Sequence, residues 1–84
     1  PFRLPHDIVL DQEGGAFVTD GLGKAIWHVV EGSEPQKLVD GDPLVNPVGI
    51  SRQEGKMIVA DSHARSVFSV DSKGQVIPLV TPEE

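Results

Sequence analysis

The sequence predicts an all-β fold made of two four-stranded antiparallel sheets. Short apolar runs rich in Val, Ile and Phe alternate with turn clusters rich in Gly, Asp and Pro along the chain, a pattern typical of strands joined by tight hairpins. The second half of the sequence repeats the first in register. No stretch combines a helical apolar period with capping residues, so we expect no helix.

Each half of the chain contains four apolar runs, which are the expected strands. Turn clusters containing Gly or Pro separate them, because Gly supplies positive φ and Pro pre-sets φ in hairpin loops. The expected strands of the first half are residues 8–10, 16–19, 25–30 and 37–39. Those of the second half are residues 49–51, 57–60, 66–70 and 76–80.

The internal repeat divides the chain into residues 1–42 and 43–84. Identities and conservative pairs stay in register through strands, turns and charges, apart from a one-residue shift around residues 9–11. The matched pairs include Pro5 with Pro47, Ile8 with Ile50, Val18 with Val59, Asp20 with Asp61, Trp27 with Phe68, and Val29 with Val70. Four-stranded meanders repeating every 40 or so residues are typical of β-propeller blades. We therefore expect one blade in residues 1–42 and a second in residues 43–84.

The expected strands are apolar on both faces. Residues 16–19, 57–60 and 26–30 do not alternate between apolar and polar, as a strand with one wet face would. Two blades cover only the faces that meet each other, and the outer two would stay open as large apolar patches. Joining residues 81–84 of one copy to residues 1–5 of another also reproduces the linker at residues 40–47, within one residue. We expect copies of the chain to complete a ring, with a six-bladed homotrimer preferred and an eight-bladed homotetramer next.

Size and charge narrow the possible partners. A chain of 84 residues without cysteine has a small core and no disulfide to support it, so oligomerisation is the expected stabilising device. A formal charge of −6 argues against nucleic acid and anionic membranes, because phosphate binding needs clustered Lys and Arg. No apolar stretch approaches the length of a membrane span.

The pattern of residues 47–50, 55–61 and 65–70 resembles the NHL repeat, and residues 5–8, 14–20 and 24–27 match it again. Asp7 stands where the repeat has Gly. The resemblance implies a propeller, most often six-bladed, that serves as a scaffold for protein, RNA or small-molecule binding, and in some relatives as an enzyme. A length of two blades also resembles engineered or excised propeller fragments that self-assemble, so we expect a designed or evolutionary-model protein.

Several residues are candidates for defined roles. Asp20 and Asp61, at the ends of the second strands, are expected to accept hydrogen bonds from loop N–H groups. Apolar and aromatic side chains are expected to fill the space between blades: Phe17, Val18, Trp27, Ile58, Val59 and Phe68. His6 and Asp7 are weak candidates for a cation site, because a blade's first strand usually lines the central channel.

We expect a structural, self-assembling module without catalytic activity and without a cofactor. The chain has no Cys nucleophile and no recognisable Ser-His-Asp arrangement. Its three histidines, His6, His28 and His63, are scattered along the chain. The alternative is a scaffold that binds a ligand or peptide. A less favoured alternative, resembling metal-dependent lactonases or lyases, would need Glu, Asp and Asn ligands from different blades, and Asn46 is the only Asn.

Overall fold

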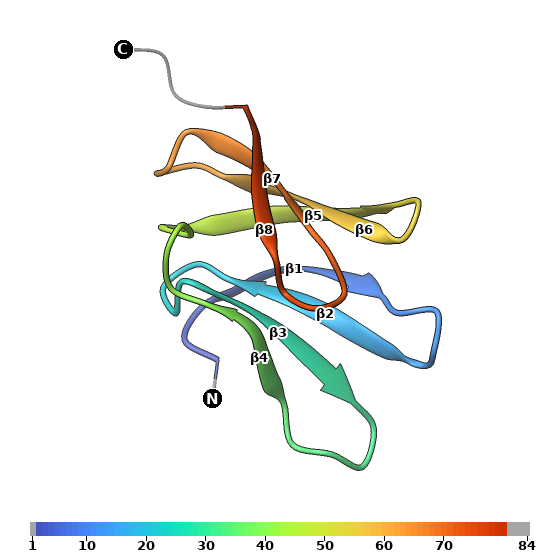
Figure 1. The fold of residues 1–84 in the computed structure, drawn as a ribbon. Helices are drawn as coiled ribbons and strands as arrows, with labels where there is room; N and C mark the ends of the chain where they lie inside the picture. Colours follow the sequence, from blue (N-terminus) through green and yellow to red (C-terminus); the bar gives the residue numbers. More distant parts are fainter. Residues whose placement is uncertain (1, 81–84) are drawn as a thin grey trace.

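The computed structural model of the chain describes residues 2–80, which form two four-stranded sheets (Figure 1). In both sheets the strand order follows the sequence, and every neighbouring pair is antiparallel. The first sheet consists of β1 (Pro5–Leu10), β2 (Gly15–Asp20), β3 (Ala25–Val30) and β4 (Gln36–Asp40). The second consists of β5 (Pro47–Gln53), β6 (Lys56–Asp61), β7 (Ser66–Val70) and β8 (Val76–Val80). The prediction of an all-β chain with two such sheets is confirmed.

Strands β3, β7 and β8 have the predicted bounds, whereas the first strand of each sheet is longer than predicted. The additional N-terminal residues of β1 and β5 lie beyond a register irregularity, between Pro5 and Asp7 and between Pro47 and Gly49. A bulge of this kind lets pairing resume past an unpaired residue. The apolar pattern did not reveal these residues because each added stretch begins with Pro, which is depleted in strands.

The two sheets repeat each other in backbone geometry as well as in sequence. Lys24 and Arg65 occupy the same turn position with φ of 53° and 54°. Leu10 pairs with Ala16, whereas the matching Arg52 pairs with Met57. The segment between the paired residues is therefore one residue longer in the first sheet, at 11–15, than in the second, at 53–56, and the one-residue shift in the sequence repeat falls here.

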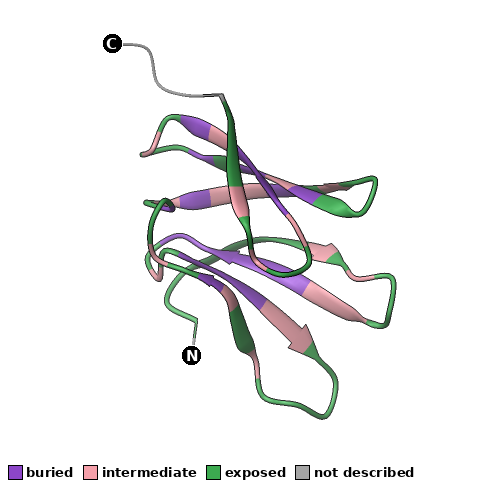
Figure 2. Ribbon diagram, viewed as in Figure 1, coloured by how far each residue is buried: buried purple, intermediate pink, exposed green. Residues whose placement is uncertain are grey.

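The sheets stack face to face, with their closest approach along β1 and β2 against β5 (Figure 1). Side chains from both sheets form one buried cluster between them. Its members are Phe17, Ile26 and Val39 from the first sheet, with Leu44, Ile50, Met57, Val59, Phe68 and Val70 from the second sheet and the linker before it. Burial of each such side chain is worth about 1.5–3 kcal/mol. Figure 2 shows buried segments in the middle strands and in β5, while most of β1 and β4 is exposed or half-buried.

No helix long and apolar enough to cross a membrane occurs in residues 2–80. The stack of two antiparallel four-stranded meanders is consistent with a pair of neighbouring propeller blades.

Candidate functional site

Asp20 ends β2 and ties the chain's N-terminal segment to the β2–β3 turn. Its fully buried carboxylate accepts hydrogen bonds from the backbone N–H groups of Arg3, Leu4 and Gly23, each at 2.9 Å. It also accepts one from the indole Nε1–H of Trp27 at 3.2 Å. The carboxylate thus satisfies four donors that no strand pairing reaches.

Asp61 occupies the matching position in the second sheet and makes the matching backbone contacts. Its oxygens accept hydrogen bonds from the N–H groups of Val45 at 2.8 Å, Asn46 at 2.9 Å and Ala64 at 2.9 Å. Three N–H donors in the same relative positions hold both aspartates, which accounts for the repetition of Asp at this position.

Hydrogen bonding makes Asp20 sensitive to acid. Burial would raise the pKa of Asp20, but the N–H groups of Arg3, Leu4 and Gly23 and the indole of Trp27 outweigh it and hold the pKa below its ordinary value of 3.8.

A lowered pKa in the folded state stabilises the fold at every pH above the unfolded value, and this contribution is lost as pH falls through the folded pKa. We expect the free energy of unfolding to fall as pH decreases below about 4. In Asp20→Asn, which cannot titrate, this part of the pH dependence should be missing. Urea denaturation of both proteins between pH 2.5 and 7 measures it, and parallel curves would contradict the assignment.

Three polar side chains join the two sheets at the seam where β1 and β2 approach β5. The Asp7 carboxylate accepts a hydrogen bond from Ile50 N–H at 3.2 Å. The Thr19 hydroxyl donates to the carbonyl of Val48 at 3.0 Å. From the second sheet, the Arg52 guanidinium donates to the carbonyl of Leu10 at 3.0 Å. We refer to these bonds as the seam contacts; sequence reasoning did not find them, although Asp7 in place of the repeat's Gly was a visible signal.

His6 and Asp7, the candidates for a cation site, lie next to each other on β1. The Asp7 carboxylate accepts the N–H of Ile8 at 2.8 Å and that of Ile50 across the seam, so it lies between the sheets. The His6 ring lies against Gly21. No group of three or more His, Cys, Asp or Glu side chains with metal-binding geometry occurs in residues 2–80.

His28 and Asp11 form a side-chain hydrogen bond at the end of the seam, with His28 Nε2 and Asp11 Oδ2 3.0 Å apart. The His28 ring stacks on Phe17, with centroids 4.5 Å apart and an interplanar angle of 12°. Asp11 belongs to the longer β1–β2 loop, and the hydrogen bond from His28 together with that from Glu13 N–H lowers its pKa. The matching residue to His28 in the second sheet is Ser69, so this pair is particular to the first sheet.

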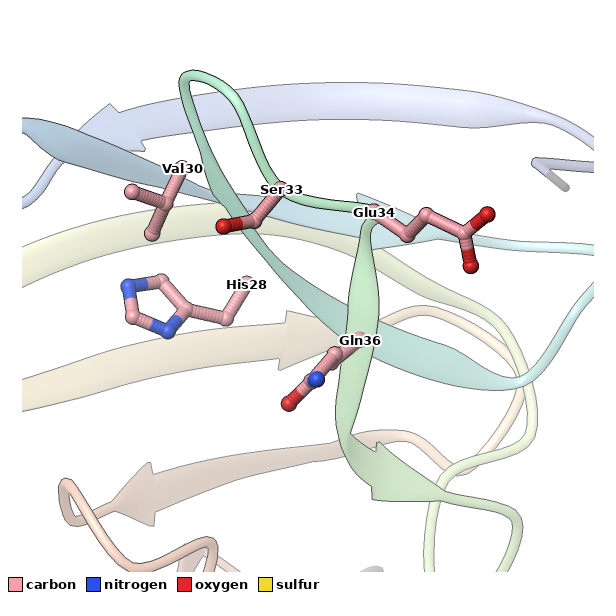
Figure 3. A pocket seen from close by; sticks show the side chains of 5 residues that line it. All are labelled: His28, Val30, Ser33, Glu34 and Gln36. Carbon is pink, nitrogen blue, oxygen red and sulfur yellow. The ribbon is translucent and has the colours of Figure 1, made fainter.

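A hollow of about 170 Å³ lies beside His28. Figure 3 shows the side chains around it, which come from β3, β4 and the loop that joins them: His28, Val30, Ser33, Glu34 and Gln36. Among these residues, His28 has a side-chain hydrogen bond to Asp11.

A second cluster of polar side chains lies near the turns that follow Asp20 and Asp61. The Asn46 amide lies 2.8 Å from His63 Nδ1 and donates to the Ser62 hydroxyl at 3.0 Å. An adjoining hollow of about 290 Å³ is lined by residues that lie outside the strands, among them Leu4 before β1, Leu22 in the β2–β3 turn and Val45 in the linker before β5.

The two aromatic residues at the same third-strand position have different surroundings. Phe68 lies in the cluster between the sheets. Trp27 lies on the far side of the first sheet, where it packs with Val18 and Ala25. The Phe2 ring contacts Trp27 edge-on, with centroids 5.2 Å apart, and Lys37 Nζ lies 5.3 Å from the Trp27 ring. Both residues use the same face of their blade-like sheet, but only the face with Phe68 meets another sheet.

The outer face of the first sheet is made by Ile8, Leu10, Val18, Trp27 and Val29, with Phe2 beside them. It is equivalent in position to a face of the second sheet whose apolar residues are buried, with Arg52 at the position of Leu10. Ile8 is 57% exposed, whereas the matching Ile50 is 7% exposed. Phe2 is 36% exposed and the matching Leu44 only 1%. The positions are equivalent in backbone register, so the neighbouring sheet alone makes the difference.

The outer face of the second sheet, made by Ser51, Ile58, Ala60, Val67 and Ile77, shows the converse. Ala60 is exposed, whereas the matching Thr19 is completely buried against the second sheet. Val67 is half-buried, whereas the matching Ile26 is 0% exposed. Each outer face therefore carries the residue pattern of a face that is buried inside the chain.

No family model matches the chain, and no curated protein matches it.

Proposed function

We propose that the chain is a structural module, a pair of NHL-like propeller blades that associates head to tail with copies of itself. The main observation behind this proposal is that the strand positions on each outer face match those of a face that is buried within the chain. The Ile50 face is covered by the first sheet, and the Ile8 face, which is equivalent in strand register, is exposed in the single chain.

Head-to-tail association follows from the direction of these faces. The face of the first sheet with Phe17 and Ile26 covers the face of the second sheet with Ile50 and Phe68. On the second sheet, the outer face with Ile58 and Val67 is equivalent to the inner face of the first sheet. On the first sheet, the outer face with Ile8 and Trp27 is equivalent to the inner face of the second sheet. The same rotation that relates the two sheets therefore relates the second sheet of one copy to the first sheet of the next, which is a heterologous contact.

If the rotation between neighbouring sheets is a whole fraction of a full turn, its repetition at every junction closes a ring. NHL-type propellers most often have six blades, so we favour three copies, with four copies as the alternative. In this proposal the molecule needs no catalytic residues and no cofactor, because its polar clusters serve turns, the seam and the packing of neighbouring sheets.

Replacement of Ile8 by Asp is expected to dissociate the assembly. Ile8 is 57% exposed in the single chain, so Ile8→Asp should leave the sheets folded. At a copy-to-copy junction the same change loses apolar burial and adds a buried charge. We expect association to weaken by about 100-fold or more, or about 2.7 kcal/mol. Sedimentation velocity with wild type at several concentrations measures the mass, and circular dichroism checks the sheets.

Gln12→Asp is the matched control, because it adds the same charge at an exposed residue of the β1–β2 loop, outside the strands. It should keep the wild-type mass. A wild-type chain that stays monomeric at all concentrations while folded would refute the proposal, as would an Ile8→Asp variant with unchanged mass.

A further inference from the structure

The outer face of the first sheet contains an apolar hollow of about 320 Å³. It lies at the start of β1, on the side away from the second sheet. Its lining residues are Phe2, Pro5, His6, Asp7, Ile8 and Val18. Leu44, Pro47, Val48, Gly49, Ile50 and Val59 hold the matching positions in the second sheet.

Inside the chain, that matching place is filled by the first sheet. The Thr19 hydroxyl donates to the carbonyl of Val48, and the Asp7 carboxylate accepts the N–H of Ile50. Leu44 and Pro47, which border the same place, are fully buried. The contact between the two sheets of one chain thus shows which positions of a neighbouring sheet fill the place that matches this hollow.

We infer that Ala60 of one copy enters the hollow on the first sheet of the next copy, in the register of Thr19, and faces the backbone carbonyl of His6. This inference rests on the proposed function and adds to it the register of the copy-to-copy junction. Ala60 matches Thr19 in strand pairing: Ala60 pairs with Gly49, and Thr19 pairs with Asp7.

At the copy-to-copy junction, the three side chains that form the seam contacts are replaced by residues that cannot form them. Gly49 stands in place of Asp7 and Ala60 in place of Thr19, and on the receiving sheet Leu10 stands in place of Arg52. The junction between copies is therefore an apolar version of the seam, without its side-chain hydrogen bonds. It follows that the copies separate more easily than the two sheets of one chain.

Restoring the Thr hydroxyl tests the register. Ala60→Thr is expected to tighten the association of copies by about threefold to tenfold at each junction, which corresponds to one added hydrogen bond. Ala60→Val is the matched control, because Val has the shape of Thr and no hydroxyl. A dilution series by sedimentation or mass photometry gives the dissociation constants of wild type and both variants. The expected order of affinity is Thr above Val.

Leu10→Arg is an independent second variant on the receiving sheet. Leu10 is 74% exposed, so Arg is tolerated in the single chain, and its guanidinium should reach the carbonyl of Arg52 in the neighbouring copy. We expect tighter association here too, and a further gain when Leu10→Arg is combined with Ala60→Thr.

The outcomes separate the register from the proposed function. If wild type assembles but Ala60→Thr associates no more tightly than Ala60→Val, and Leu10→Arg gives no gain, the register is wrong while self-association stands. If wild type stays monomeric, both are wrong. Tightening by both variants, with Val behind Thr, supports the register.

Discussion

Asp20→Ala is expected to lower the free energy of unfolding by about 3–5 kcal/mol, since buried donors left without a partner cost about 1–3 kcal/mol each. The buried carboxylate accepts four hydrogen bonds, from three backbone N–H groups and the indole of Trp27. A loss of this size is a large fraction of the stability of a small protein. Trp27 is the only Trp, so its fluorescence during urea denaturation reports both the unfolding and the lost contact.

Asp40→Ala is the matched control. Asp40 has a 67% exposed side chain and a single side-chain contact, with Lys37 Nζ at 3.4 Å. Exposed ion pairs of this kind contribute little, so the change should stay within about 0.5 kcal/mol. A loss for Asp20→Ala no larger than that for Asp40→Ala would show that the four hydrogen bonds to the Asp20 carboxylate do not stabilise the fold.

Ile26→Ala is expected to cost about 2–5 kcal/mol, because it leaves a cavity in the cluster between the two sheets. Ile26 is 0% exposed and contributes to that cluster from the middle of the first sheet. The loss should not depend on protein concentration, since both sheets belong to one chain. Urea denaturation at two protein concentrations measures it.

Val67→Ala, at the matching position on the outer face of the second sheet, is the informative comparison. Val67 is half-buried within the chain, so the change should cost well under the Ile26→Ala value at high dilution. Where copies associate, its cost should rise with concentration. Equal and concentration-independent losses for both variants would contradict the equivalence of the two faces.

The repeat and the turn chemistry were accessible from the sequence because they depend on local preferences. Gly and Asp clusters located the hairpins, and apolar runs gave the bounds of β3, β7 and β8. Asp20 and Asp61 stood out because they are repeated at the ends of equivalent strands. The N-terminal extension of β1 escaped detection, since its pairing passes a bulge at residues that are poor strand formers.

The seam contacts depended on the tertiary structure. Asp7 and Ile50 are far apart in the sequence, as are Arg52 and Leu10, and no local pattern relates them. The hydrogen bond between His28 and Asp11 likewise needs the fold to bring a loop residue to β3. Sequence pattern locates a side chain on a strand face, but only the stacking of sheets decides which donor meets which acceptor.

The sequence alone determines the class of fold, the twofold repeat and the presence of apolar residues on both faces of each sheet. These features are set by strand periodicity and turn residues. The tertiary structure decided which of those faces are buried. Ile50 is covered and the equivalent Ile8 is not, because burial depends on the neighbouring sheet rather than on the residue itself.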